Sequence, residues 1–191
     1  MCENCEFISL DECLILAPDE EKRRYELHNN TFENKGYVDM FLSFIDSAIL
    51  PHKDHVSSAL DFGCGTTPVL ATLLKEHIEY VDHYDPYFYP HEEVFKKKYD
   101  LITTTEVIEH LKSPLMQLSE LVSRLNPHGI LAIMTRFHPG NDIEFLKWWY
   151  IRDETHISFY TVNTLRVIAN AIGGVLLSND NVKYCVMKKK G

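Results

Sequence analysis

Strand-like and helix-like segments alternate through most of this chain, and this alternation restricts its fold more than any other feature. Short apolar runs that fit strands lie at 56–62, 80–84, 99–104 and 129–135. Segments with one apolar face that fit helices lie at 37–49, 67–77, 114–125 and 162–172. Thr161 is placed to cap the last of these helices. The order predicts a mostly parallel α/β sheet, closed by an antiparallel pair at 175–178 and 182–187.

The first of these strands ends in an acid and two glycines, in the run Ala59-Leu-Asp-Phe-Gly-Cys-Gly. Glycine permits a turn where the backbone comes close to a ligand. A second acid, Asp85, ends the next strand 20 residues after Gly65. Rossmann-like folds place a carboxylate at about this spacing to accept from ribose hydroxyls. The region therefore predicts a site for an adenosine-containing cofactor.

Two residues in this region favour a positively charged cofactor over a dinucleotide. A pyrophosphate-binding loop needs a third glycine, and this chain has Pro68 at that position. Asp61 would add a like charge beside a phosphate, whereas it suits a cationic ligand. Ligands of open α/β sheets lie beyond the carboxyl ends of the strands. The loops expected to form the site are therefore 63–68, 85–91, 104–110 and 135–140.

Four segments in this order resemble the motifs of class I, Rossmann-like S-adenosylmethionine-dependent methyltransferases. Leu60-Asp-Phe-Gly-Cys-Gly resembles motif I, and Asp85 resembles the acid of motif II. Tyr99-Asp-Leu-Ile-Thr-Thr-Thr-Glu-Val-Ile-Glu-His-Leu is similar to the family's fourth-strand segment, and Leu125-Asn-Pro-His-Gly-Ile-Leu to the stretch before its fifth strand. The resemblance spans about residues 37–188 and implies methyl transfer to an O, N or C nucleophile, with S-adenosyl-L-methionine as cofactor.

The resemblance also implies a role for individual residues. The amides of Gly63, Cys64 and Gly65 would lie under the methionine part of the cofactor and face its carboxylate. Asp61 would lie near its ammonium group or hold the loop in shape, and Asp85 would bind the ribose hydroxyls. The pocket wall near the transferring methyl would include Thr105 and Glu106. Glu109 is expected to be structural, as a carboxylate in the first turn of a helix.

The chain departs from the family between motif II and the fourth strand. Only 14 residues separate Asp85 from Asp100, and they include Pro86 and Pro90. A strand and a helix do not fit in this segment, so the third of the family's usual seven strands is expected to be absent or reduced. The second strand would then form the sheet edge. Tyr87 or Phe88 would cover the adenine ring, or these aromatic residues fill the core at the edge.

The segment 148–161 is a candidate acceptor-binding region, because methyltransferases commonly cover the acceptor between the fifth strand and the last helix. It contains Trp148, Trp149, Asp153 and His156. His156 is the candidate catalytic base, because the usual pKa of histidine lies near neutrality and the side chain could remove a proton from an attacking O–H or N–H group. The alternative is that the tryptophans are core residues and that His156 makes a structural hydrogen bond.

Residues 1–35 are polar, weakly periodic and contain three of the five cysteines. Cys2 and Cys5 look like half of the zinc ribbon that some bacterial methyltransferases carry at the N-terminus. A closed zinc site needs four ligands, and no second pair lies near, so we expect an incomplete site and no bound metal. Tyr25-Glu-Leu-His-Asn-Asn resembles a segment that folds over the cofactor as a lid.

Length and charge restrict the possible partners. The 191 residues fit one methyltransferase domain, with residues 1–35 as an extension or lid. The net charge of −9 argues against nucleic-acid binding and favours a small-molecule acceptor. The sequence has neither a signal peptide nor an apolar stretch that would span a membrane, so a cytoplasmic protein that does not bind membranes is expected.

Two other classes of function fit part of the sequence. A nicotinamide-dependent oxidoreductase would need the third glycine, and the segment 106–110 also counts against it. A non-enzymatic methyltransferase-like module, or a partner subunit, would fit the short segment after Asp85 and the incomplete cysteine site.

Overall fold

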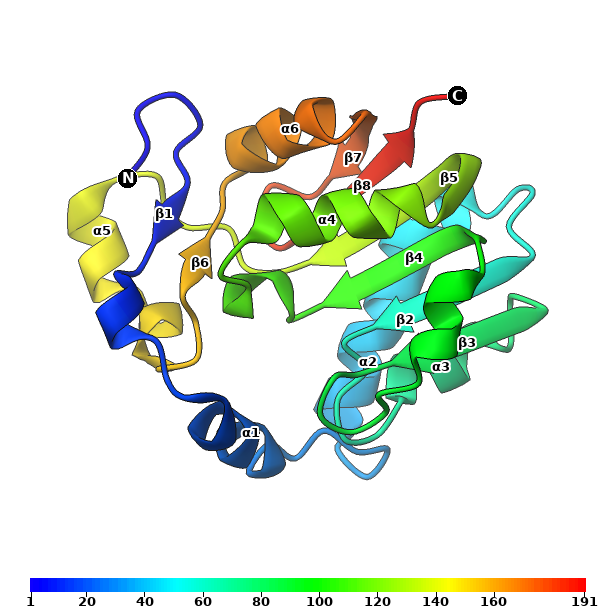
Figure 1. Ribbon diagram of the computed structural model, residues 1–191, viewed down its shortest axis with the longest axis horizontal. Coiled ribbons are helices and arrows are strands. Elements are labelled where there is room, and N and C mark those ends of the chain that lie inside the picture. The colour runs from blue at the N-terminus through cyan, green and yellow to red at the C-terminus, as the bar shows by residue number, and fades with distance from the viewer.

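A six-stranded sheet forms the centre of the protein (Figure 1). The computed structural model describes residues 1–191. In spatial order the strands are β3 (Tyr80–Tyr84), β2 (Ser58–Phe62), β4 (Tyr99–Thr105), β5 (Leu125–Met134), β8 (Tyr184–Lys189) and β7 (Gly174–Asn179). The first four are parallel, and β8 is antiparallel to both of its neighbours. The predicted mostly parallel sheet with an antiparallel C-terminal pair is confirmed.

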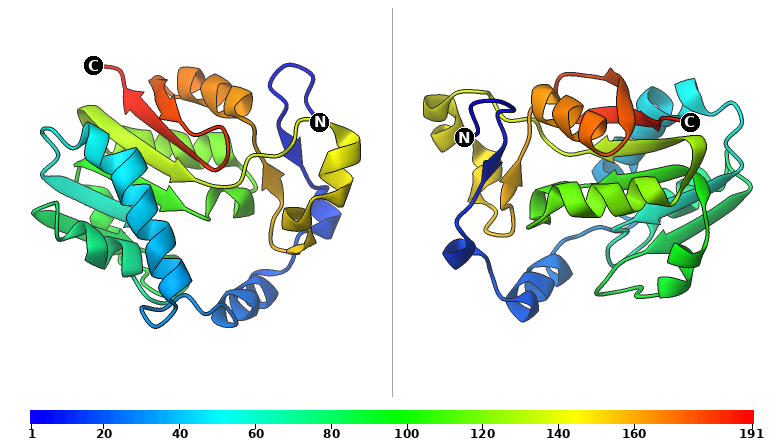
Figure 2. Two further views of the ribbon diagram at one scale, coloured as in Figure 1. Left: turned by 180° about the vertical axis from the view of Figure 1, so that it is seen from behind. Right: turned by 45° about the horizontal axis from the view of Figure 1, so that its top comes forward.

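Helices cover both faces of the sheet (Figures 1 and 2). One face carries α2 (Lys35–Phe44), which continues through a π-helical turn (Ile45–Ile49), and α3 (Val69–Leu74). The other carries α4 (Pro114–Ser123) and α6 (Val162–Ala171). Successive strand residues point to opposite faces, so Ala59 is buried under α2 and α3 whereas Leu60 is buried under α4 and α6. Each layer thus has its own apolar core.

The sheet ends at β3, as the short segment after Asp85 predicts. Between β3 and β4 the chain forms only a 3-10 turn (Glu92–Lys96) and an isolated bridge between Asp85 and Tyr89. The absence of a further strand is therefore confirmed. The outer side of β3 is partly covered by this turn, which packs Phe95 against Tyr84.

The N-terminal segment lies beside the sheet (Figure 1). Strand β1 (Ile8–Ser9) pairs with β6 (Ser158–Phe159) in a separate two-stranded sheet, next to α5 (Asp142–Lys147). Helix α1 (Pro18–Glu26) then leads back towards α2. The remaining 3-10 turns are Glu12–Leu14, Leu50–His52, Ile108–His110 and Trp149–Arg152. None of the helices combines the length and the apolar character that crossing a membrane requires.

Candidate functional site

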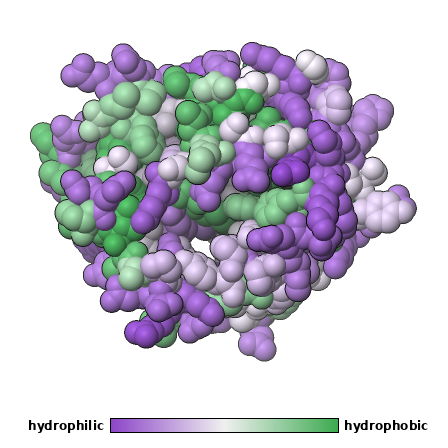
Figure 3. Space-filling model, in the orientation of Figure 1, coloured by the Kyte–Doolittle hydropathy of each residue, from purple (hydrophilic) through white to green (hydrophobic).

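A cavity of about 740 Å³ lies at the carboxyl ends of β2, β3 and β4. Thr105 at the end of β4 and four residues of the loops after these strands contribute to its lining: Gly63, Gly65, Asp85 and Glu106. Helix α1 lies across the cavity, and Figure 3 shows the hollow in the face of the molecule seen in Figure 1. The volume is within the range of about 300–1,000 Å³ that is usual for small-molecule and cofactor sites.

The glycine turn is shaped by contacts within the protein. Gly63 has φ +81°, and a Cβ there would lie 2.3 Å from Val107, so only glycine fits. The amides of Gly63 and Cys64 both donate to the carbonyl of Tyr84, and the amide of Gly65 donates to Asp85. Contrary to the expected role, these three amides have no proton free for a cofactor carboxylate. The amide of Thr66, which also lines the cavity, makes no hydrogen bond within the protein.

Asp85, directly after β3, accepts hydrogen bonds from three backbone amides. Its Oδ2 accepts from the amide of Gly65 at 3.0 Å, and its Oδ1 accepts from the amides of Tyr87 and Phe88 at 2.9 and 3.1 Å. A carboxylate offers about four lone-pair positions. Three of them are used, so Asp85 can accept one ribose hydroxyl while it still holds the turn.

Asp61 and Cys64 are buried beside the turn and do not line the cavity. Thr103 donates to Asp61 at 3.0 Å, and burial raises the pKa of Asp61 to about 7. The thiol of Cys64 points to the carbonyl of Gly65, and burial raises its pKa. Of the two roles expected for Asp61, holding the loop in shape agrees with this position.

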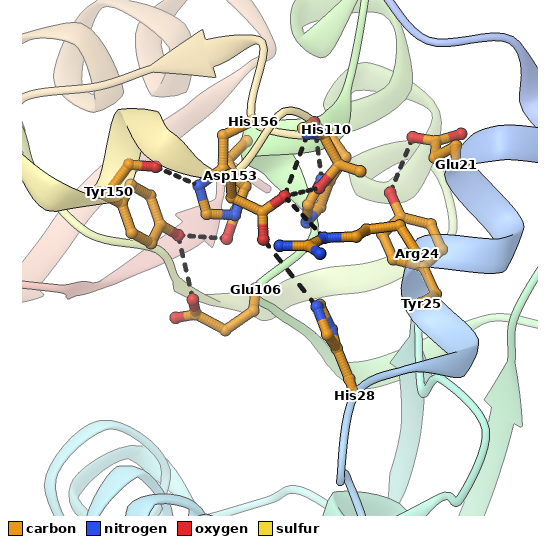
Figure 4. Close-up of polar contacts among 11 residues, drawn as sticks. Glu21, Arg24, Tyr25, His28, Glu106, His110, Tyr150, Asp153 and His156 are labelled. Atoms are coloured by element: carbon orange, nitrogen blue, oxygen red, sulfur yellow. Dashed lines mark hydrogen bonds and ion pairs between the residues drawn. The ribbon is translucent and has the colours of Figure 1, made fainter.

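The loop after β4 forms the opposite wall of the cavity. Thr105 and Glu106 both line it, and Glu106 has φ +53°. The hydroxyl of Tyr150 lies 3.0 Å from Glu106 Oε2 (Figure 4). It is also bonded to Glu109 Oε1. Burial raises the pKa of Glu106 to about 8, with a further contribution from Glu109, and burial also raises the pKa of Glu109. The wall therefore holds two carboxyls that share one tyrosine hydroxyl.

His156 lies in this wall next to His110, with their ring centroids 4.9 Å apart (Figure 4). The Nδ1 of His156 lies 2.8 Å from the carbonyl of Tyr150, and both histidines line the cavity. Burial, and then the neighbouring His110, lower the pKa of His156 to about 4. The imidazole is thus neutral at neutral pH, and its pKa is lower than the value near neutrality assumed for a general base.

Helix α1 and the chain after it complete the cavity, and Tyr25, His28 and Asn30 of the predicted lid line it. The hydroxyl of Tyr87 donates to Glu21 at 2.6 Å, which joins α1 to the loop after β3. On the other side Asp153 lies 3.9 Å from both Arg24 and His28 (Figure 4). Residues 18–30 therefore bridge the two walls.

The structure also shows residues that the sequence did not identify. Tyr150 is buried and joins Glu106 to Glu109, and Thr66 supplies the free amide of the glycine turn. Glu109 is fully buried and lies in the first turn of a helix, as expected, but this helix is the short 3-10 turn Ile108–His110. The spacing of Glu106, Glu109 and His110 was visible in the sequence and could have indicated that they share a wall.

The cysteines of residues 1–35 lie away from the cavity. Cys2 and Cys13 are exposed and Cys5 is partly buried. No group of three or more potential metal ligands includes any of them. Of the two tryptophans, Trp149 is exposed at the cavity and its ring faces Arg136, so it is not part of the core.

Comparisons with known proteins give one family and one fold. A family model for a methyltransferase domain matches residues 37–179. None of the curated proteins compared with the chain matches its sequence. Similar solved structures include an O-methyltransferase family protein from Burkholderia thailandensis, with 10% sequence identity and a TM-score of 0.65; the alignment covers 90% of this chain and 63% of that chain.

Two further structures have the same fold. One belongs to the complex between the Haloferax volcanii Trm112 methyltransferase activator and the putative methyltransferase (TM-score 0.65, 11% identity, 92% of this chain and 100% of that chain). The other is the mitomycin 7-O-methyltransferase MmcR (TM-score 0.61, 10% identity, 88% and 60%). The chain thus spans less than two thirds of the length of MmcR and of the Burkholderia protein.

Proposed function

This chain belongs to the methyltransferase domain family, and we propose that it transfers the methyl group of S-adenosylmethionine to an O, N or C nucleophile of a small-molecule acceptor. The observation that carries the proposal is the single cavity that joins the glycine turn and Asp85 to the wall of Glu106 and His156. At the end near the glycine turn, Asp85 can accept a hydrogen bond from a nucleoside, and the amide of Thr66 can donate one to an amino acid carboxylate. The other end leaves room for a second molecule.

The residues present fit this cofactor. Asp85 can accept from one ribose hydroxyl, and the free amide of Thr66 can donate to the cofactor carboxylate. Glu106 is the carboxyl of the far wall that would face the positive charge of a sulfonium. Tyr87 and Phe88 line the cavity beside Asp85, where an adenine ring would need an aromatic or apolar cover.

When bound, the cofactor supplies an activated methyl group on a sulfonium. A lone pair of the acceptor forms the new bond to the methyl carbon as the carbon–sulfur bond breaks, and the acceptor's proton is lost to a base or to water. The protein's part is to align the two molecules and to exclude water. His156 presents its ring to this space, but its lowered pKa makes it a weak proton acceptor on its own.

Calorimetric titration of the purified protein tests the cofactor. We expect S-adenosylmethionine and S-adenosylhomocysteine to bind, and NADH not to bind. Asp85→Asn should weaken binding by at least about tenfold, which is about 1.4 kcal/mol, because the amide nitrogen of asparagine would face an N–H donor of the turn. Asp82→Asn is the matched control, since Asp82 lies on β3, three residues before Asp85, and outside the cavity. Binding of NADH alone, or of neither nucleoside, would contradict the proposal.

A second candidate function is that of a methyltransferase subunit that acts with a partner. Its support is the similarity to a chain from a complex with an activator protein, which the alignment covers completely. If the protein binds the cofactor and yields no methylated product with a broad panel of acceptors, this candidate is favoured. Acceptor-dependent formation of S-adenosylhomocysteine by the isolated chain would rule it out.

A further inference from the structure

Three potential metal ligands meet in the wall of the cavity opposite the glycine turn. Glu109, His110 and His156 each bring one ligand atom within 4.8 Å of the other two. Ligand atoms bonded at about 2.0–2.2 Å to one ion can be at most about 4.4 Å apart. The most widely separated ligand atoms would therefore need to approach one another by up to roughly 0.4 Å if they bind on opposite sides of an ion, and by up to roughly 1.4 Å if they bind at tetrahedral angles.

Both histidines are already oriented as metal ligands are. The Nδ1 of His110 lies 2.9 Å from the carbonyl of Thr155. The Nδ1 of His156 lies 2.8 Å from the carbonyl of Tyr150 (Figure 4). A carbonyl only accepts, so each Nδ1 carries the proton and each Nε2 has a free lone pair. Neither Nε2 makes a hydrogen bond within the protein, and both rings line the cavity. Metal-binding histidines typically donate their second N–H in this way.

The carboxyl of Glu109 is also held in place by a hydrogen bond within the protein. Its Oε1 accepts from Tyr150, whereas its Oε2 is buried and has no hydrogen-bond partner. Glu109 has no exposed surface, and a carboxyl oxygen left unpaired in such a place is unfavourable because it has lost its hydration. A hydrogen-bond network built only for stability would be expected to pair this oxygen. A cation would supply the partner that the protein lacks.

We propose that Glu109, His110 and His156 bind a divalent transition-metal ion in the acceptor end of the cavity. Two imidazole nitrogens and one carboxylate suit Zn²⁺, Mn²⁺ or Co²⁺ better than Ca²⁺, which prefers oxygen ligands. Three protein ligands leave at least one coordination position open, as in catalytic sites. Because the histidines line the cavity, that position is available to a second molecule.

The position of the ion also indicates the acceptor class, and this step rests on the proposed methyl transfer. A hydroxyl oxygen bound to the ion loses its proton more readily, because the metal stabilises the resulting anion. The proton goes to water, the oxygen attacks the methyl carbon, and the carbon–sulfur bond breaks. The expected acceptor is therefore a hydroxyl compound.

Direct metal binding tests this inference without an activity assay. The metal-free protein is titrated with Co²⁺ and followed by visible absorption, and Zn²⁺ content is measured by elemental analysis after dialysis. We expect one equivalent of either ion and a visible band without the sulfur-to-cobalt charge transfer of cysteine ligands. His110→Gln and His156→Gln should each weaken binding by at least about tenfold. The same is expected of Glu109→Gln, with circular dichroism to confirm that each variant folds.

Two controls separate this site from others. His138 is another buried histidine, and its Nε2 is hydrogen-bonded to the carbonyl of Glu6. The variant His138→Gln should leave Co²⁺ binding unchanged. The double variant Cys2→Ser, Cys5→Ser should also bind one equivalent. Failure of the unchanged protein to bind either ion, or unaltered binding in both histidine variants, would overturn the inference and leave the cofactor titration unaffected. Metal binding by a protein that binds no S-adenosylmethionine would instead contradict the proposed function alone.

Discussion

At the scale of single residues, Asp61 shows how the sheet accommodates an acid in its interior. The side chain is buried at the end of β2 and accepts from Thr103 of β4. Burial raises its pKa from 3.8 to about 7. In the folded protein it therefore keeps its proton at pH values where the unfolded chain has lost it.

This shift predicts that Asp61 lowers the stability of the protein as the pH rises. Between pH 3.8 and about 7 the unfolded state ionises first, so the free energy of unfolding falls through this window and levels off above it. In the variant Asp61→Asn this decrease in the free energy of unfolding does not occur, because asparagine does not ionise. Relative to the wild type, its stability should increase by on the order of a few kcal/mol from pH 4 to pH 7. Urea unfolding at several pH values measures the difference.

The comparison needs a control for the removal of a negative charge. Asp39→Asn changes an exposed carboxylate on α2, and its stability should follow that of the wild type across this pH range. A difference between Asp61→Asn and wild type that stays constant from pH 4 to pH 7 would show that Asp61 is ionised in the folded protein.

At the scale of elements, the start of α6 is joined to the N-terminal segment. Thr161 caps the helix through a bond from the amide of Thr164 to its Oγ1. The same hydroxyl donates to Glu6 at 2.6 Å, and the hydroxyl of Thr164 donates to the carbonyl of Cys5. The cap thus stabilises the helix and also holds residues 1–9 in place.

Removing this cap should destabilise the protein. Thr161→Ala loses both hydrogen bonds of the hydroxyl, and we expect the free energy of unfolding to fall by about 1–2 kcal/mol. Thr161→Ser retains the hydroxyl and is the matched variant; it should remain within about 0.5 kcal/mol of the wild type. Equal losses in the two variants, measured by urea unfolding, would argue that the methyl group and not the cap is responsible.

The elements of the sheet and its helices could be predicted from the sequence because their apolar residues repeat with a clear period. The cap at Thr161 and the missing strand after Asp85 followed from local residue types and from chain length. Helix α1 and strand β1 could not be predicted, since they bury few apolar residues and depend on partners such as Tyr87 and β6. The contact of Glu109 with Tyr150 spans 41 residues, and no local pattern indicates it.

At the scale of the whole molecule, α1 connects the two sides of the cavity. The bond from Tyr87 to Glu21 joins it to the sheet edge, and Asp153 lies near Arg24 on the other side. These contacts are few and partly exposed, so α1 should open more easily than the core.

Protease sensitivity tests this link. Tyr87→Phe removes only the hydroxyl that donates to Glu21, and we expect trypsin to cleave α1 at Lys22, Arg23 or Arg24 about 2–10-fold faster. Tyr80→Phe removes the hydroxyl of an exposed tyrosine on β3 and serves as the control. If both variants are cut at the rate of the wild type, the hydroxyl of Tyr87 does not hold the helix closed.

The missing strand has a consequence for the behaviour of the protein in concentrated solution. A sheet that ends at β3 leaves a row of backbone donors and acceptors on which another chain could add a strand. At five residues this row is short, and the ion pair of Lys97 with Asp82 places two charges beside it. Charges at a short edge discourage such pairing. The shortened connection thus leaves a sheet edge at β3 whose length and charge disfavour the addition of a strand from another chain.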